Sequence, residues 1–431
     1  MPSSIALAAH FFLQLAVVLL ACRACGLLLV RLGQPQVVGD MVAGFVLGPI
    51  LAALLPTVHS DLFPSSGPST PILYVLGQLG LVLYLFVVGL SFDTGILRGH
   101  LRTSATTGSV SLGVPLVAGA GLGLVLSDAG WFPDGVSTWQ AILFTGTAIA
   151  ISAFPVLARM VFEQGLTRTR IGTIALACAA IDDVAAWILF ATVLATARHD
   201  PLIAVLALTG GVVYVVVVLV VGRPVLRRFA SWAVVGTGMR PATLPIIVTV
   251  LLLCAWFTDV MGGYAVFGAF LLGAVMPRGQ FADRLRDRIE PVTTAVLLPM
   301  FFVYTGLQLR PQAIFTWTVL VAVVGVTATA VASKGLACTL ASRHGGLSWR
   351  DSVSVGALMN ARGLMELVLI NAALAAGLLT QQLYTVFAVM TVVTTVLAVP
   401  LHRLAQRALA GALNPASSAP RRGIASMVRR R

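Results

Sequence analysis

The chain is a series of long apolar runs joined by short polar connections. About thirteen of these runs approach the ~20 residues that an α-helix needs to cross a membrane. Because the connections are too short to hold a soluble domain, the pattern predicts an all-α polytopic membrane domain over residues 1–402. The basic Pro/Ser/Ala-rich segment 403–431 is expected to be a short disordered cytoplasmic tail. The runs are centred near Val18, Phe45, Tyr84, Val117, Ala150, Val184, Val213, Val250, Phe270, Phe302, Val324, Glu366 and Val389.

The composition fits a chain whose main solvent is lipid. Hydrophobic residues make up 58% of the chain and charged residues 10%, whereas soluble domains are about a quarter charged. A soluble protein of 431 residues would need far more charge to cover its surface. A soluble protein is therefore excluded.

The net charge of +13 is a topology signal and not a nucleic-acid footprint. Arginines occur in alternate connections, and the intervening connections hold almost none. By the positive-inside rule, this predicts a bacterial-type inner (plasma) membrane protein with its N-terminus outside and its C-terminus in the cytoplasm. The arginines of these connections are Arg31, Arg98, Arg102, Arg168, Arg170, Arg223, Arg227, Arg228, Arg240, Arg278, Arg284, Arg286, Arg288, Arg343 and Arg350.

Two pairs of short segments suggest an internal repeat. Residues 43–48 (AGFVLG) resemble residues 268–273 (GAFLLG), and residues 86–90 (FVVGL) resemble residues 302–307 (FVYTGL). Both pairs are separated by the same odd number of runs, so related helices must cross the membrane in opposite directions. This is the pattern of an inverted-topology repeat, which many secondary transporters share.

The repeat predicts that the fifth and twelfth runs are related helices, both interrupted near mid-membrane. The fifth run contains Thr147, Ser152 and Pro155, and the twelfth contains Asn360 and Gly363. Proline lacks an N–H and disturbs the helix one turn earlier, so we expect a break there. Broken helices present carbonyls that can coordinate a cation. An ordinary proline kink, with Ser and Thr bonded to their own helix, is the alternative.

Two neighbouring carboxylates lie in the sixth run, at Asp182 and Asp183. A charged residue at mid-membrane costs on the order of 3 kcal/mol, so such residues persist for a reason. Adjacent helical residues point ~100° apart, which lets one carboxylate face a water-filled cavity and the other a neighbouring helix. A carboxylate can hold either a proton or a metal cation. A purely structural ion pair is the alternative reading.

Lys334 is the only lysine of the chain, and it falls in the middle of an apolar run. Arginine stays charged, whereas a buried lysine can release its proton. Lys334 is therefore a candidate proton carrier, or alternatively a permanent counter-ion for Asp182 or for a helix end.

Arg362 and Glu366 lie one helical turn apart in the twelfth run. At this spacing they can pair on one helix face. We expect them to neutralise each other and the ends of the broken helices, and not to carry ions.

With these residues in view, the chain resembles the second monovalent cation:proton antiporter family, which includes Na⁺/H⁺ and K⁺/H⁺ exchangers. The resemblance spans about residues 5–402 and is most specific at 152–159, 179–187 and 359–367. It implies that Asp183 is the principal ion- and proton-binding carboxylate and that Asp182 interacts with Lys334. It also implies crossed broken helices with Ser152 at the crossing, a homodimer, and, from the paired aspartates with the lysine, electrogenic exchange.

We therefore expect a secondary antiporter that exchanges Na⁺ or K⁺ for protons by alternating access, with Thr147 and Ser152 helping to bind the cation. No cofactor, enzymatic activity or resident metal is expected. Two alternatives are a proton-coupled exporter of a small organic solute on the same fold and an uncoupled ion channel. An intramembrane aspartyl protease is disfavoured, because its two aspartates lie on separate helices.

Overall fold

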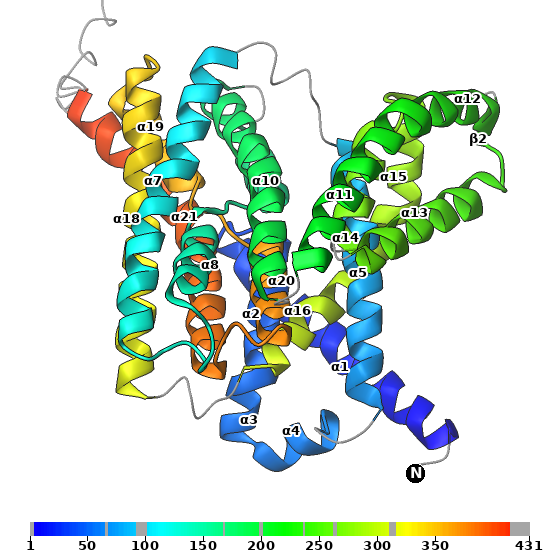
Figure 1. Ribbon diagram of the computed structural model, residues 1–431, viewed down its shortest axis with the longest axis horizontal. Coiled ribbons are helices and arrows are strands. Elements are labelled where there is room, and N and C mark those ends of the chain that lie inside the picture. The colour runs from blue at the N-terminus through cyan, green and yellow to red at the C-terminus, as the bar shows by residue number, and fades with distance from the viewer. Residues whose placement is uncertain are drawn as a thin grey trace, which may run out of the picture.

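The computed structural model describes residues 4–64, 68–91, 101–166, 169–197, 201–235, 238–261, 265–309 and 316–413. The side chains of some residues inside these ranges, among them Pro155 and Asp183, lie outside the description. The described chain is almost entirely helical (Figure 1). A two-stranded antiparallel hairpin, β1 (Val234–Val235) and β2 (Gly238–Met239), joins two of the helices.

Nine helices in the part of the chain that the structure describes are long and apolar enough to cross a membrane. The other four predicted runs fall on helices that are broken, shorter or incompletely described. They are the α8/α9 pair, α10, α14 and the α19/α20 pair. The predicted all-α membrane architecture is confirmed, and the count of thirteen spans stays a prediction.

One group of helices packs around the broken pairs and occupies the left of Figure 1. We call it the core bundle. The largest cluster of buried apolar side chains lies mainly within it. Its members are α7 (Leu101–Asp128), α8 (Thr138–Ala150), α9 (Phe154–Glu163), α10 (Arg170–Ala197), α18 (Trp317–His344), α19 (Trp349–Leu358), α20 (Leu364–Ala375) and α21 (Gln381–Leu413).

The remaining helices form a second group, whose larger part lies on the right of Figure 1, while α2 and α16 lie between the groups. We call it the flanking bundle. It has apolar clusters of its own. It contains α1 (Ser4–Arg31), α2 (Gln36–Phe45), α3 (Leu51–Leu54), α4 (Pro56–Leu62), α5 (Ser69–Ser91), α11 (Pro201–Val217), α12 (Arg223–Ala233), α13 (Thr243–Val260), α14 (Ala265–Val275), α15 (Gln280–Val292) and α16 (Leu298–Leu307). Three short π-helical turns, η1 (Val46–Ile50), η2 (Val218–Gly222) and η3 (Thr293–Leu297), continue α2, α11 and α15.

Glycine contacts inside the flanking bundle support the inverted repeat. Helix α2 with η1 packs on α16 where Gly48 meets Gly306, and α5 packs on α14 where Gly89 meets Gly273. At each position a Cβ atom would collide with the backbone of the opposite helix. In the predicted repeat, Gly48 corresponds to Gly273 and Gly306 corresponds to Gly89. The Gly48–Gly306 contact of one repeat is therefore the counterpart of the Gly273–Gly89 contact of the other. Backbones can approach this closely only where both helices carry small residues.

The last helix of the described chain crosses the predicted boundary between membrane domain and tail. Helix α21 continues to Leu413, past the expected end at residue 402. Tertiary contacts hold this extension, because Arg403 donates to the carbonyls of Leu32 and Gly33 and Gln406 donates to the Ser354 hydroxyl. Residues 414–431 lie outside the described part of the chain.

Candidate functional site

The two broken helix pairs cross each other in the core bundle. Helix α8 ends at Ala150 and α9 begins at Phe154, while α19 ends at Leu358 and α20 begins at Leu364. The Ala153 amide donates to the Ala361 carbonyl at 3.1 Å, so the two extended segments are joined through their backbones.

The predicted site residue Ser152 strengthens this crossing. It is fully buried, and its hydroxyl donates to the Met359 carbonyl at 3.1 Å. Pro155 is the second residue of α9, a position where the absence of an N–H costs no helical hydrogen bond. The interruption thus lies one turn before the proline, as the sequence pattern predicts.

Arg362 lies in the second break and reaches the end of the first broken helix. Its guanidinium donates to the carbonyls of Ala148 and Ile149, in the last turn of α8. The last carbonyls of a helix have no partner within the helix and carry a partial negative charge, which the guanidinium compensates. The same group pairs with Glu366 at 3.3 Å, and both side chains are buried.

Lys334, on α18, contacts the same helix end from another direction. Its Nζ lies 2.6 Å from the Ala150 carbonyl and 2.6 Å from Oδ2 of Asp182 on α10. Both side chains of the ion pair have an exposure of 0%. Two cationic groups therefore converge on the last turn of α8, which is where the helix has been cut short.

Asp182 has further bonds besides the one to Lys334. The Ser111 hydroxyl of α7 lies 3.1 Å from Oδ1 and 3.0 Å from Oδ2 of this carboxylate. Asp182 is thus held by two neighbouring helices. Asp183 follows it on α10, so its Cα–Cβ direction is turned by ~100° about the helix axis, and its side chain lies outside the described part of the structure.

The other predicted polar residues are placed near the breaks but differ in their contacts. The Thr147 hydroxyl donates to the Leu143 carbonyl of its own helix at 2.7 Å. The Asn360 amide nitrogen donates to the Gly356 carbonyl at 2.9 Å. Its Oδ1 atom is buried without a hydrogen-bond partner among the described residues. Gly363 precedes α20 and packs against Val156, leaving no room for a Cβ atom.

Two residues of this region were missed in the sequence analysis. Ser111 binds Asp182, and the Thr395 hydroxyl of α21 accepts from the Arg362 amide at 3.1 Å. The sequence feature that could have indicated them is the high density of Ser and Thr within otherwise apolar runs, at residues 103–111 and 391–395. Such runs more often bond to their own helix, so the pattern alone does not select these two side chains.

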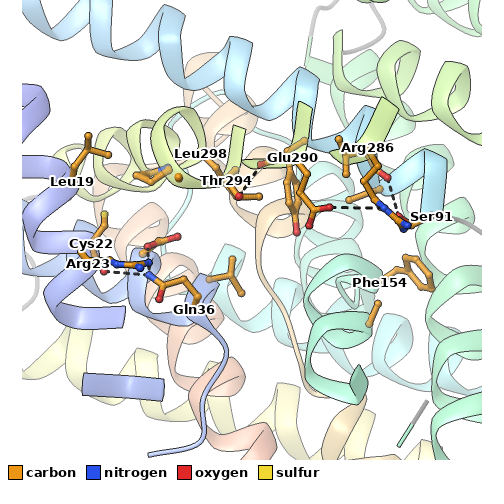
Figure 2. A pocket seen from close by; sticks show the side chains of 18 of the residues that line it. Leu19, Cys22, Arg23, Gln36, Ser91, Phe154, Arg286, Glu290, Thr294 and Leu298 are labelled. Carbon is orange, nitrogen blue, oxygen red and sulfur yellow. Dashed lines mark hydrogen bonds and ion pairs between the residues drawn. The ribbon is translucent and has the colours of Figure 1, made fainter. Parts of the chain in front are cut away.

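A cavity of about 1070 Å³ lies between the core and flanking bundles and reaches the start of α9 at Phe154 (Figure 2). Its far walls are formed by α1, α2, α5 and the α15–α16 segment. Arg286 donates to the Ser91 hydroxyl at 3.3 Å and lies 4.0 Å from Glu290. Asp40 of α2 also lines the cavity; its side chain is buried and accepts a hydrogen bond from Gln36 at 3.2 Å.

These features together define a class of protein. Two helices break and cross inside a membrane domain, and a buried acid–base pair and a cavity large enough for water lie beside them. This arrangement is typical of a secondary transporter. Irregular backbone at membrane depth is tolerated only inside protein or against water.

Comparison with known proteins agrees with this class. The model of the sodium/hydrogen exchanger transmembrane family matches residues 15–403. The Na⁺/H⁺ antiporter NhaS4 of Synechocystis is 34% identical over 90% of this chain and 95% of its own length. The Cation/H⁺ antiporter 18 of Arabidopsis thaliana is 31% identical over 90% of the chain, which spans 48% of that longer protein. The K⁺/H⁺ antiporter 1 of Saccharomyces cerevisiae is 28% identical over 91% of the chain and 46% of its own length.

Solved structures show the same fold. The sodium proton antiporter MjNhaP1 of Methanocaldococcus jannaschii aligns with a TM-score of 0.62 at 15% identity, covering 94% of this chain and 98% of that one. The chain therefore belongs to the sodium/hydrogen exchanger family of monovalent cation:proton antiporters.

Arg362→Lys is expected to lower exchange at least 10-fold. Lysine keeps the positive charge near Glu366 but cannot donate to two carbonyls at once in the planar geometry of guanidinium. The last turn of α8 would lose part of its compensation. Initial rates of ion-dependent proton movement in everted vesicles, normalised to protein amount, measure the effect. Unchanged rates would show that charge alone suffices at this position.

Proposed function

We propose that this chain exchanges Na⁺ or K⁺ for protons by alternating access, with Asp183 as the exchanging carboxylate. The observation that carries the proposal is the fully buried Asp182–Lys334 pair at the cut end of α8. Membership in the antiporter family supports the choice of ions, and the related antiporters include one named for Na⁺ and one named for K⁺. The choice of an organic solute has no such support.

The contacts of Asp182 favour a division of labour between the two aspartates. Both oxygens of Asp182 already have donors, from Ser111 and Lys334. The adjacent Asp183 is the carboxylate left to exchange its proton for a cation. A carboxylate binds either ion but not both together, and this competition couples the two fluxes.

Lys334 offers a second route for a proton. Its ammonium group bonds at once to a carboxylate and to the Ala150 carbonyl, which are both ligands that an alkali cation prefers. A cation bound at the neighbouring Asp183 would repel the charge of this ammonium group. Lys334 would then release its proton, and exchange would move net charge.

Oxygen ligands for the cation are available around the helix crossing. The Asn360 Oδ1 atom has no partner among the described residues, and burying such an atom costs free energy unless a donor or a cation meets it. The Ser152 hydroxyl, the Thr147 hydroxyl after a rotamer change, and the backbone carbonyls of the breaks complete a set of hard oxygen ligands.

The cavity supplies access from one side of the membrane. It opens near Gln36, Ser91 and Arg286, at helix ends that the arginine distribution assigns to the cytoplasm. We therefore assign an inward-facing conformation, with the N-terminus outside and the C-terminal end of α21 inside, as the arginine distribution predicts. Alternating access requires the core bundle to move against the flanking bundle so that this cavity closes and another opens.

A polar cluster joins the two bundles on the opposite side. The Asn371 amide of α20 donates to the Thr305 hydroxyl of α16 at 3.1 Å. The Tyr384 hydroxyl of α21 lies 3.0 Å from both the Thr305 carbonyl and Asn371 Oδ1. We call these three residues the outer clasp. Because it links core and flanking helices, its bonds must break before an outward path can open.

Tyr384→Phe is expected to increase outward opening about 5-fold. The lost hydroxyl bond contributes about 1 kcal/mol to the inward-facing conformation and nothing once the clasp has opened. Hydrogen exchange of amides in residues 300–309 and 380–387 measures the opening, with residues 243–260 as an internal reference. Equal exchange in both proteins would show that the clasp does not hold this side closed.

The proposal includes a location in the plasma membrane and a homodimeric state. The dimer rests on the family resemblance, in which the flanking bundle forms the contact between copies. Exposed apolar side chains on α1, α11 and η2, such as Leu20, Val213 and Val220, are compatible with either lipid or a second copy. Mass measurement in detergent over a range of concentrations distinguishes the two.

Ion-dependent proton flux tests the proposed function. Purified protein in liposomes with an internal pH dye is exposed to Na⁺, K⁺, Li⁺ or choline at equal ionic strength. We expect alkalinisation on addition of Na⁺ or K⁺, with choline inactive. An imposed voltage that changes the rate would establish net charge movement. Currents without proton coupling would identify a channel and overturn the proposal.

A further inference from the structure

A second cavity, of about 530 Å³, lies away from the transport site at one end of the flanking bundle. It is bounded by α12, the preceding η2 turn and the segment that follows α14, at the upper right of Figure 1. We call it the arginine pocket. Its lining residues are Leu219, Arg223, Arg227, Ala274, Val275, Met276, Pro277 and Arg278. Every ionisable residue of this lining is an arginine, so the pocket is strongly cationic.

Two of the three arginines are available for a ligand. Arg223 and Arg227 lie one turn apart on α12, and both are exposed. Neither forms a hydrogen bond or ion pair with any residue that the structure describes. Arg278 is held differently, because it donates to the carbonyls of Gly89, Leu90 and Ala274. Two guanidinium groups at this spacing can share one phosphate, with several N–H donors directed at its oxygens.

The surface next to the pocket is apolar and belongs to the membrane-crossing part of the same helix. Leu219, Val220 and Val221 of η2 have exposures of 46%, 68% and 55%. Val216 and Val217 of α11 continue this surface away from the arginines. A ligand that fits both the arginines and this apolar surface has a negatively charged headgroup and an apolar chain. Free phosphate would use only the arginines and leave the apolar wall uncovered.

We propose that the arginine pocket binds the phosphate headgroup of an anionic phospholipid, whose acyl chain lies along η2 and α11. Basic pockets between membrane helices on the cytoplasmic side have the charge and depth for such headgroups. The carbonyl end of α14 also lies in this pocket, so a competing role for the arginines is to compensate that helix end. The two roles differ in their dependence on lipid charge.

Lipid binding to the purified protein tests the proposal. Wild type and Arg223→Gln/Arg227→Gln are titrated in neutral detergent with phosphatidylglycerol, phosphatidylcholine or inorganic phosphate, and bound lipid is counted by native mass spectrometry. The matched control is Arg31→Gln/Arg288→Gln, which removes two exposed arginines outside the pocket. We expect the pocket variant to bind phosphatidylglycerol about 30-fold more weakly and the control to bind it like wild type.

Three results would overturn the proposal. Equal loss in the control would assign binding to overall charge, and equal competition by inorganic phosphate would remove the lipid as the ligand. Unchanged phosphatidylglycerol binding with lower thermal stability in every lipid would assign the arginines to the end of α14. If the glutamine variant does not fold, Arg223→Lys/Arg227→Lys is used instead, and we expect it to retain binding to phosphatidylglycerol with reduced preference over phosphatidylcholine.

Discussion

Asp183→Asn is expected to abolish ion-dependent proton movement while leaving membrane insertion and yield unchanged. Asparagine has nearly the same volume but cannot take up or release a proton. The neighbouring Asp182 cannot replace it, because Ser111 and Lys334 already occupy its oxygens. We expect the rate in reconstituted liposomes to fall to that of protein-free liposomes at every pH and for each of Na⁺, K⁺ and Li⁺.

Two controls make this result specific. Asp134→Asn changes an exposed aspartate outside the helices and should exchange ions at the wild-type rate. Asp183→Glu keeps a titratable group and should retain measurable exchange with an altered dependence on pH. Full exchange by Asp183→Asn would exclude this residue as the exchanging carboxylate.

Lys334→Met is expected to lower the free energy of unfolding by about 3–5 kcal/mol, because it leaves Asp182 buried without its counter-charge. The carboxylate has an exposure of 0%, so water cannot replace the lost partner without a change of structure. The Ala150 carbonyl at the end of α8 loses its donor in the same variant. Thermal unfolding of the protein in detergent measures the loss.

A double variant separates the ion pair from general packing effects. In Asp182→Asn/Lys334→Met both charges are removed, so we expect most of the stability to return. Replacing a buried pair by neutral groups is often close to neutral, whereas removing one partner is not. Exchange should stay strongly impaired, since the proposed proton route through Lys334 is absent. A double variant as unstable as Lys334→Met would show that volume and shape, not charge, explain the loss.

The helices and their interruptions were predictable because they depend on local chemistry. Apolar runs of sufficient length must be helical in lipid, since every backbone N–H needs a partner within its own segment. Pro155 has no backbone N–H to continue that pattern, and the helix ends one turn before it. Proline alone does not force a break, because Pro115 and Pro400 lie inside the continuous helices α7 and α21. The pairing of Arg362 with Glu366 follows from their spacing on one helix. The matched glycine-containing segments likewise indicated the repeat, because a repeat is visible in the sequence without knowledge of its contacts.

The contacts between helices could not be predicted in this way. The family resemblance implied the contact between Asp182 and Lys334, which are far apart in sequence. Nothing in the sequence indicated that Ser111 would be the third member of this group. The burial of Asp40 depends on how α2 packs against α1 and α16. The extent of α21 beyond residue 402 likewise depends on the loop that receives Arg403.

Amino-acid order alone determined that this is a helical membrane protein, which runs are interrupted, and which few charges are placed in lipid. Those properties come from transfer free energies and backbone hydrogen bonding, and both act within one segment. Only the tertiary structure decided that Lys334 and Arg362 meet on the last turn of α8, that Ser111 joins Lys334 at Asp182, and which helices line the large cavity. These depend on packing between distant segments, which the local pattern does not encode.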